Sequence, residues 1–368
     1  MSDKIRNIVV TCIFVLFIFF FAAMCIVNYF NPTATSESER RPLAQFPDEI
    51  TWQGIVDKTV IDEFEDYSVD QFPFREFFRS IKAKFQLGVL GLKENNGLAV
   101  EDGYIAKVEQ DFNDKVTDYS VGRLEYIYNK YIKDNGGNKY VSIIPDKNYF
   151  LGEKYGYVAP DYDALVGKVT SALDGMEYID IFGALELGDY YRTDTHWSQE
   201  KLHDVLAVLS DKMGFEVSGE YTENVASEDF KGVYFGQSAL SPDPDKIVYL
   251  TNDVLDALTV YDYENNQTYG IYDVSKLGGN DEYEFFLSGT RALLRIDNPN
   301  ATSDKELVIF RDSYGSSISP LIAEGYKSVY VVDIRYVMPD IVPMLIELDG
   351  KDVLFLYSTL ILNSNSFK

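Results

Sequence analysis

The chain contains two histidines, so an imidazole that takes part in catalysis must be His196 or His203. Asp194 stands two positions before His196, and in an extended or turning segment side chains at these positions point the same way. The carboxylate of Asp194 can then accept a hydrogen bond from one ring nitrogen while the other faces a substrate. This pair predicts a general base with a fixed tautomer. The alternative is that His196 packs at a helix start, and His203, beside core-facing leucines, is interpreted as structural.

A serine lies where an apolar, strand-like run changes into a helical stretch, in Glu306-Leu-Val-Ile-Phe-Arg-Asp-Ser-Tyr-Gly315. This order places the Ser313 hydroxyl at the carboxyl end of a sheet, where α/β proteins bind ligands. The backbone N–H groups of Ser313, Tyr314 and Gly315 would stand at a helix N-terminus and could stabilise an oxyanion. A helix cap by Asp312 or Ser313 is the alternative. Together with the Asp-supported histidine, the serine predicts a triad in the order Asp, His, Ser.

The sequence offers little for thiol or metal chemistry. Its two cysteines, Cys12 and Cys25, both lie in the N-terminal apolar run, which leaves no thiolate or disulfide elsewhere. Asp194, His196 and His203 are the alternative metal-binding set, but their spacing matches no ligand pattern such as HExxH. We therefore expect a site without a metal or another cofactor.

The chain is strongly acidic, with 59 Asp and Glu residues against 33 Lys and Arg and a formal net charge of -26. Binding to nucleic acid is driven by clustered Lys and Arg that release counterions from phosphates. The acidic balance therefore excludes nucleic acid as an expected partner.

The N-terminal part predicts a membrane anchor. The apolar run 8–27 is 20 residues long and would span about 30 Å as a helix. Lys4 and Arg6 precede it, so the positive-inside rule places the N-terminus in the cytoplasm. The alternative is a cleaved signal peptide, but such peptides have a shorter apolar core than this run. Processing as a lipoprotein is also disfavoured, because Met24 stands where that processing expects a small residue. We expect an uncleaved single-pass helix in the cell membrane.

The rest of the chain predicts one large extracytoplasmic domain. Residues 1–30 form the cytoplasmic tip and anchor, 31–50 a tether, and 51–368 the domain. Within the domain, short runs rich in β-branched residues alternate with helical stretches, at 139–144, 178–181, 307–310, 328–332 and 353–357. This alternation predicts an α/β fold with a mostly parallel sheet between helices. Residues 216–300 are rich in Tyr, Asp and Gly and predict a β-rich antiparallel insertion bordering the site.

Two stretches that carry the candidate chemistry are Tyr191-Arg-Thr-Asp-Thr-His-Trp197 and Arg311-Asp-Ser-Tyr-Gly315. They resemble the DHHW family and the related SGNH-hydrolase-like alginate O-acetyltransferases of the AlgJ and AlgX type. Further stretches are similar to other DHHW-family blocks, namely Glu39-Arg-Arg-Pro-Leu-Ala-Gln-Phe-Pro47, Asp70-Gln-Phe-Pro-Phe-Arg75 and Val331-Val-Asp-Ile-Arg-Tyr336. Thr195 replaces the first histidine of the family signature, as in the alginate enzymes, and Arg311 stands where SGNH proteins usually carry glycine.

The resemblance implies an SGNH-like three-layer fold with Ser313 as nucleophile, His196 as base and Asp194 as orienting acid. It also implies a partner, a membrane-bound O-acyltransferase that delivers the acetyl group, and a polysaccharide that accepts it. Asn148 becomes a candidate oxyanion donor, because SGNH enzymes use an Asn side chain in this role. The alternative, which the sequence supports equally, is that Asn148 only forms a turn.

A polysaccharide acceptor would need contacts around the triad. Lys147, Arg192 and Arg335 could form a local basic groove for an anionic acceptor in this acidic domain, and Trp197 could stack on a sugar ring.

We therefore expect an O-acetyltransferase that modifies an extracellular or cell-wall polysaccharide through an acyl-enzyme. A polysaccharide acetyl esterase shares the triad and differs only in that water, not sugar, attacks the acyl-enzyme. A non-catalytic glycan-binding component of an export complex is the third interpretation, and it requires an incomplete or misaligned triad.

Overall fold

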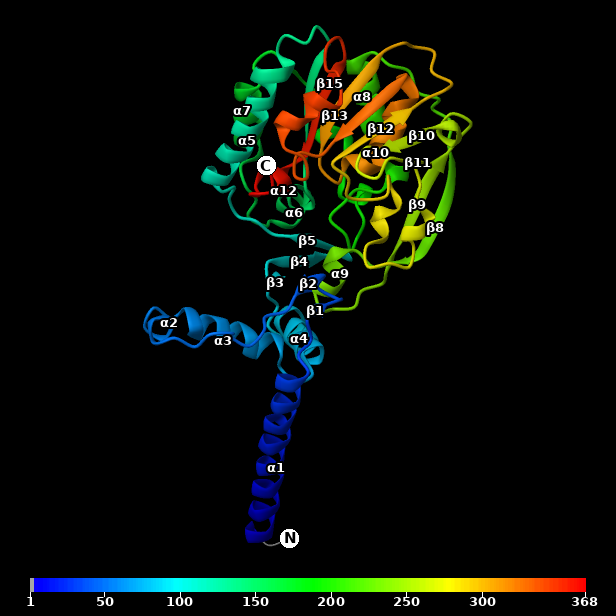
Figure 1. Ribbon diagram of the computed structural model, residues 1–368. Coiled ribbons are helices and arrows are strands. Elements are labelled where there is room, and N and C mark those ends of the chain that lie inside the picture. The colour runs from blue at the N-terminus through cyan, green and yellow to red at the C-terminus, as the bar shows by residue number, and fades with distance from the viewer. Residues whose placement is uncertain (1–2) are drawn as a thin grey trace. The chain divides into compact units, whose positions relative to one another are not determined.

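The computed structural model describes residues 3–368, which divide into two compact units (Figure 1). Unit 1 comprises Met1–Asn95 with Gly236–Ser241, and unit 2 comprises Asn96–Phe235 with Pro242–Lys368. The α-helices are α1 (Asp3–Phe30), α2 (Trp52–Val56), α3 (Thr59–Asp70), α4 (Arg75–Lys84), α5 (Asp114–Ile127), α6 (Lys147–Tyr155), α7 (Tyr162–Ala172), α8 (His203–Met213), α9 (Val233–Gln237), α10 (Gly315–Ile322), α11 (Val342–Leu345) and α12 (Thr359–Leu362).

The strands are mostly short. They are β1 (Thr35–Ser36), β2 (Arg41–Pro42), β3 (Glu94–Asn95), β4 (Leu98–Glu101), β5 (Tyr104–Lys107), β6 (Lys139–Ile144), β7 (Glu177–Tyr178), β8 (Thr222–Phe230), β9 (Asp245–Thr251), β10 (Thr259–Asp262), β11 (Gln267–Tyr269), β12 (Leu293–Asp297), β13 (Glu306–Arg311), β14 (Ser328–Val332) and β15 (Asp352–Ser358).

Unit 2 is built around an eight-stranded sheet with the order β11-β10-β12-β14-β13-β15-β6-β7. The strands from β14 to β7 pair in parallel, and β12, β10 and β11 extend the β14 edge as antiparallel strands. The expectation of a mixed α/β chain with a large, mostly parallel sheet is therefore confirmed. Residues 216–300 contribute the antiparallel part, including the separate ribbon β8–β9.

Side chains along the central strands alternate between two apolar cores, one on each face of the sheet, so the sheet is the middle of three layers. On β13, Leu307 and Ile309 pack into one apolar core while Val308 and Phe310 pack into another. The first core is completed by the apolar faces of α8 and α10, and the second by those of α5 and α7. A strand buried on both faces must be apolar at every position, and this explains the continuous apolar run of β13. The carboxyl end of this strand leads directly into the residues of the candidate site.

Unit 1 begins with α1, which is long and apolar enough to cross a membrane and carries no buried residue. After α1 in the chain come the hairpin β1–β2 and the helices α2, α3 and α4, and α4 continues into the π-helical turn η1 (Phe85–Val89). In Figure 1, α2 and α3 run across the direction of α1.

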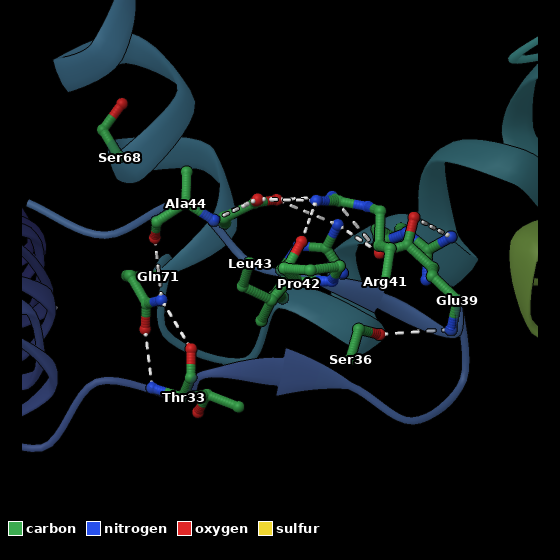
Figure 2. A network of polar contacts seen from close by, with 12 residues as sticks. Thr33, Ser36, Glu39, Arg41, Pro42, Leu43, Ala44, Ser68 and Gln71 are labelled. Carbon is green, nitrogen blue, oxygen red and sulfur yellow. Dashed lines mark hydrogen bonds and ion pairs between the residues drawn. The ribbon is translucent and has the colours of Figure 1, made fainter. Parts of the chain in front are cut away.

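A polar network holds these pieces of unit 1 together (Figure 2). The amide nitrogen of Gln71 donates to the carbonyl oxygens of Thr33 at 2.9 Å and Ala44 at 3.0 Å, and its oxygen accepts from the Thr33 N–H at 3.0 Å. Asp70 accepts from both terminal nitrogens of Arg41, at 2.8 and 2.6 Å, and from the Ala44 N–H at 2.9 Å. These two buried side chains therefore provide hydrogen-bond partners for backbone groups of Thr33 and Ala44 that lie outside regular helices and sheets.

Candidate active site

The loop before α8 holds His196 through short-range backbone contacts. Tyr190 forms an isolated antiparallel bridge with Trp197, and the Tyr191 N–H donates to the His196 carbonyl oxygen at 3.1 Å. Within this bend, one carboxylate oxygen of Asp194 accepts from the His196 N–H at 3.0 Å and lies 2.6 Å from the ring Nδ1. The carboxylate therefore orients both the backbone and the ring of the histidine.

The other oxygen of Asp194 is held from outside the loop. It accepts from the Val233 N–H at 2.8 Å. Gly232 allows this approach, because a Cβ there would lie 2.3 Å from the Cβ of Asp194. Burial by itself raises the pKa of Asp194, but the charge of His196 and the hydrogen bonds from His196 and Val233 lower that pKa well below the ordinary value. Asp194 therefore stays ionised beside the imidazole.

Ser313 lies at the turn between β13 and α10, and its Oγ is 2.8 Å from Nε2 of His196. The turn is held by Asp312, whose two oxygens accept from the Tyr314 N–H at 2.9 Å and the Ser358 N–H at 2.8 Å. Asp312 is fully buried, whereas Ser313 keeps part of its surface exposed. The structure thus brings Asp194, His196 and Ser313 into one line of hydrogen-bonded groups.

A second set of contacts joins the histidine loop to α10. The indole N–H of Trp197 donates to the Tyr314 carbonyl oxygen and to Ser317 Oγ, both at 3.0 Å. Gln199 donates to the Ser317 carbonyl oxygen at 2.6 Å, and the hydroxyl of Tyr314 donates to the Thr195 carbonyl oxygen at 2.6 Å. Trp197 is completely buried, so it supports the loop rather than presenting a face to a sugar.

Tyr283 is a site residue that the sequence did not indicate. It belongs to the 3-10 turn η8 (Glu282–Phe285), and its ring stacks on the His196 ring with centroids 3.8 Å apart and an interplanar angle of 4°. Its hydroxyl donates to Ser317 Oγ at 3.0 Å, and burial raises its pKa. No motif marks it, because it is one of 28 tyrosines and is separated from the histidine by most of the β-rich segment.

Two of the expected oxyanion donors are engaged in the turn itself. The Tyr314 N–H donates to the Asp312 side chain, and the Gly315 N–H donates to the Asp312 carbonyl oxygen at 3.0 Å. The side-chain amide of Asn148 donates to the Glu109 carbonyl oxygen at 2.9 Å. The turn that presents the serine therefore uses two of the three N–H groups that the sequence suggested for an oxyanion, those of Tyr314 and Gly315.

The basic residues expected to form a groove are dispersed. Lys147 is buried and donates to the carbonyl oxygens of Tyr191 at 2.9 Å and Arg192 at 3.2 Å, and burial lowers its pKa to about 7 against the opposing effect of nearby carboxylates. Arg335 is paired with Asp333 at 2.6 Å. The Arg192 side chain is exposed. Lys147 thus supports the histidine loop, and Arg335 neutralises a buried carboxylate.

Arg311, which stands in place of the usual glycine, is also buried. It donates to the Asp312 carbonyl oxygen at 3.2 Å and lies 3.6 Å from the Asp333 carboxylate. Its aliphatic part packs on Gly315, where a Cβ would come within 2.7 Å of the Arg311 Cβ. The absence of a side chain at Gly315 therefore leaves the space that the Arg311 side chain fills.

No group of three or more His, Cys, Asp and Glu side chains in the described part of the chain is arranged to hold a metal ion. His203 is exposed at the start of α8, where its ring centroid is 5.6 Å from that of Tyr221.

The fold defines the class: a mixed α/β protein with a large, mostly parallel sheet, in which hydrogen-bonded Asp, His and Ser side chains lie at the carboxyl end of a central strand. The family model described as "DHHW protein" matches residues 181–332, a segment that contains all three side chains. The resemblance to the DHHW family is confirmed over this segment. None of the curated proteins matches the chain.

Solved structures with a similar fold include a DHHW family protein from Eubacterium siraeum, at 22% identity and a TM-score of 0.59, covering 74% of this chain and 94% of that one. PatB1 of Bacillus cereus, with a sulfonyl adduct, is similar at 17% identity and a TM-score of 0.58, covering 74% and 96%. The O-acetyltransferase domain of Pseudomonas putida AlgJ is a weaker match, at 11% identity and a TM-score of 0.44, covering 73% and 93%.

Proposed function

We propose that Ser313, His196 and Asp194 form the catalytic triad of an SGNH-type O-acetyltransferase. The observation that carries the proposal is the continuous contact from Asp194 Oδ1 to His196 Nδ1, at 2.6 Å, and from His196 Nε2 to Ser313 Oγ, at 2.8 Å. This is the nucleophile, base and orienting acid arrangement of acyl-transfer enzymes. A scaffold without catalysis would not need this alignment.

In the first half-reaction, Ser313 Oγ attacks the carbonyl carbon of an acetyl donor. Its proton passes to Nε2 of His196, and the ionised Asp194 stabilises the imidazolium that forms. His196 then returns the proton to the leaving group, which departs and leaves an acetyl ester on Ser313.

In the second half-reaction, a sugar hydroxyl replaces the leaving group. His196 Nε2 accepts the hydroxyl proton as the oxygen attacks the acyl-enzyme, and the proton is returned to Ser313 Oγ when the product leaves. The resemblance to the DHHW family and the alginate enzymes supports an extracellular or cell-wall polysaccharide as acceptor. It also supports a membrane-bound O-acyltransferase as the supplier of acetyl groups. The N-terminal helix supports a single-pass anchor with the N-terminus in the cytoplasm and unit 2 outside.

The test uses the full chain in detergent with an activated acetyl ester. We expect Ser313 to be acetylated in the rapid phase of turnover, as seen by peptide mass spectrometry. A sulfonyl fluoride should block the reaction by labelling the same residue. Ser313→Ala and His196→Ala should each lower turnover by about 10³-fold or more, and to similar extents, because triad residues act as a unit.

The matched control is Ser316→Ala, which removes a nearby serine that is buried in α10 and should leave turnover unchanged. Adding oligosaccharide acceptors separates the two competing chemistries. Acetylated oligosaccharide identifies a transferase, whereas release of acetate alone, at a rate that acceptors do not change, identifies an esterase. Full activity of Ser313→Ala would disprove the enzymatic proposal.

A further inference from the structure

The helix α4 and the turn η1 that continues it carry their large apolar side chains on the outside. Phe77, Ile81, Phe85 and Val89 are 61%, 47%, 50% and 70% exposed. Their spacing of four residues places them along one face of the helix. A contiguous exposed apolar face of this kind marks a surface that contacts something other than water.

The opposite face of α4 is polar and is the one that unit 1 buries. Arg75 pairs with Glu39 at 2.5 Å, and Arg79 pairs with the same carboxylate at 3.0 Å. Arg79 also donates to the carbonyl oxygen of Gly236 at 3.2 Å, and Ala83 is fully buried. This amphipathic pattern is inverted relative to that of a helix in a water-soluble domain, where the apolar face packs inward.

The apolar face continues onto α1 through aromatic contacts. The ring of Phe20 stacks on Phe74 with centroids 6.1 Å apart, and the ring of Phe21 lies 5.7 Å from Phe72 and 6.0 Å from Phe78. Five phenylalanines thus join the middle of α1 to the start of α4. The contacts lie within unit 1.

These contacts set the depth of the start of α4 relative to a bilayer that α1 spans. Phe20 and Phe21 precede Val27, the end of the apolar run, by two turns of helix, or about 10 Å. The outer half of a hydrocarbon core is about 15 Å thick. The side chains that pack on Phe20 and Phe21 therefore lie at the level of acyl chains, not of solvent.

Polar contacts hold this depth in place. The Asn28 side chain, near the end of α1, donates to the Gln71 carbonyl oxygen at 2.8 Å, in the turn that leads into α4. The Gln71 side chain is in turn bound to Thr33 and Ala44. The exposed Lys82 and Lys84 lie on the two borders of the apolar face by helical geometry, where their long stems can reach the headgroups.

We propose that the apolar face of α4 and η1 is immersed in the outer leaflet of the same membrane that α1 crosses, with lipid acyl chains as its partner. The proposal also makes α1 a permanent part of unit 1, because cleaving it would uncover Phe72, Phe74 and Phe78. It rests on α1 being the membrane anchor and is independent of the chemistry at Ser313.

The test is a depth measurement on the full chain in nanodiscs that contain only phospholipid. In a background with Cys12→Ala and Cys25→Ala, single cysteines are introduced as Phe77→Cys and Phe85→Cys and labelled with an environment-sensitive fluorophore. Neither replacement disturbs a buried side chain. Glu76→Cys is the matched control, on the opposite side of the same helix and more than half exposed.

We expect the labels at 77 and 85 to be quenched several-fold more by lipids with a nitroxide on the acyl chain than the label at 76. An aqueous quencher should show the reverse order. Equal access of the aqueous quencher to all three labels would overturn the proposal. Protection of the labels at 77 and 85 from both quenchers would also overturn it, because the face would then be covered by protein, such as a second copy of the chain.

Discussion

Two buried carboxylates, Asp194 in unit 2 and Asp70 in unit 1, show how the partner decides what such a group does. Asp70 faces the guanidinium groups of Arg41 and Arg75, at 2.6 and 3.2 Å, and the hydrogen bonds from Arg41 lower its pKa. Asp194 faces an imidazole whose far nitrogen contacts a partly exposed serine. Guanidinium keeps its proton under all ordinary conditions, whereas imidazole exchanges one. The Asp70 network is therefore a fixed ion pair that holds unit 1 together, whereas the Asp194 network can transfer a proton.

We expect the largest effect from Asp194→Asn. The amide offers one acceptor oxygen where the carboxylate uses two, for His196 and for the Val233 N–H, and it carries no charge. The tautomer of the ring is then no longer fixed, and the imidazolium loses its counter-charge. We expect turnover to fall by about 10⁴-fold, the size known for this change in serine-protease triads, with little change in thermal stability. Steady-state kinetics with an acetyl ester measures it. Asp204→Asn, an exposed carboxylate on α8, is the control, and equal losses in both variants would contradict the assigned role.

The matching change in unit 1 is Asp70→Asn. It removes one of the two carboxylates that face Arg41 and Arg75, while Glu39 stays within 3.4 and 2.5 Å of them. We therefore expect unit 1 to lose about 1.5 kcal/mol of stability, the size of a hydrogen bond to a charged group. Turnover should be unchanged, because Asp194, His196 and Ser313 all lie in unit 2. Hydrogen exchange of the α4 amides in the detergent-solubilised chain reports the loss, and Asp66→Asn on the exposed side of α3 is the control. A loss of activity as large as that of Asp194→Asn would show that the Asp70 network takes part in catalysis.

A smaller effect is expected from the ring that stacks on His196. Tyr283→Ala removes the stacking and should lower kcat by about 10-fold while KM stays the same, since aromatic pairs of this kind contribute about 1 kcal/mol. Tyr283→Phe keeps the ring and loses only the hydroxyl contact with Ser317, so it should restore most of kcat. Similar kcat values for the Ala and Phe variants would mean that stacking does not position the imidazole.

The last prediction concerns the stability of the fold and not turnover, and it is made for Lys147. Its folded-state pKa of about 7 lies below the value of an exposed lysine, so the unfolded chain binds more protons above pH 7. Stability contributed by this group therefore rises with pH through the window from about 7 to 10, by about 1 kcal/mol over the first pH unit. Chemical denaturation at several pH values should show that Lys147→Met lacks this gain. A pH dependence identical to that of the unmodified chain would place the lysine outside the buried site.

The parts of the structure that depend on local sequence were predictable. The strands β13 and β15 could be predicted because a strand buried on both faces needs an unbroken apolar run. The pairing of Asp194 with His196 was predictable for a similar reason, since side chains two positions apart in a bend point the same way. The position of Ser313 followed from the change of a strand into a helix.

Other features depend on contacts between distant segments, and no local pattern marks them. Tyr283 reaches His196 only because the segment after β11 packs beside the histidine loop. The expected oxyanion donors, Tyr314 and Gly315, satisfy Asp312, and this became visible only once the turn geometry was known.

The chemical groups of this protein can be read from its residues: two histidines of which one has a carboxylate partner, a serine after a buried strand, and an apolar N-terminal helix. Which of these groups meet depends on the fold. It brought Ser313 to the imidazole across more than a hundred residues, and it turned the polar face of α4 inward. The physical reason is that hydrogen bonds and apolar packing are short-range forces, so their partners are chosen by the fold and not by neighbours in the chain.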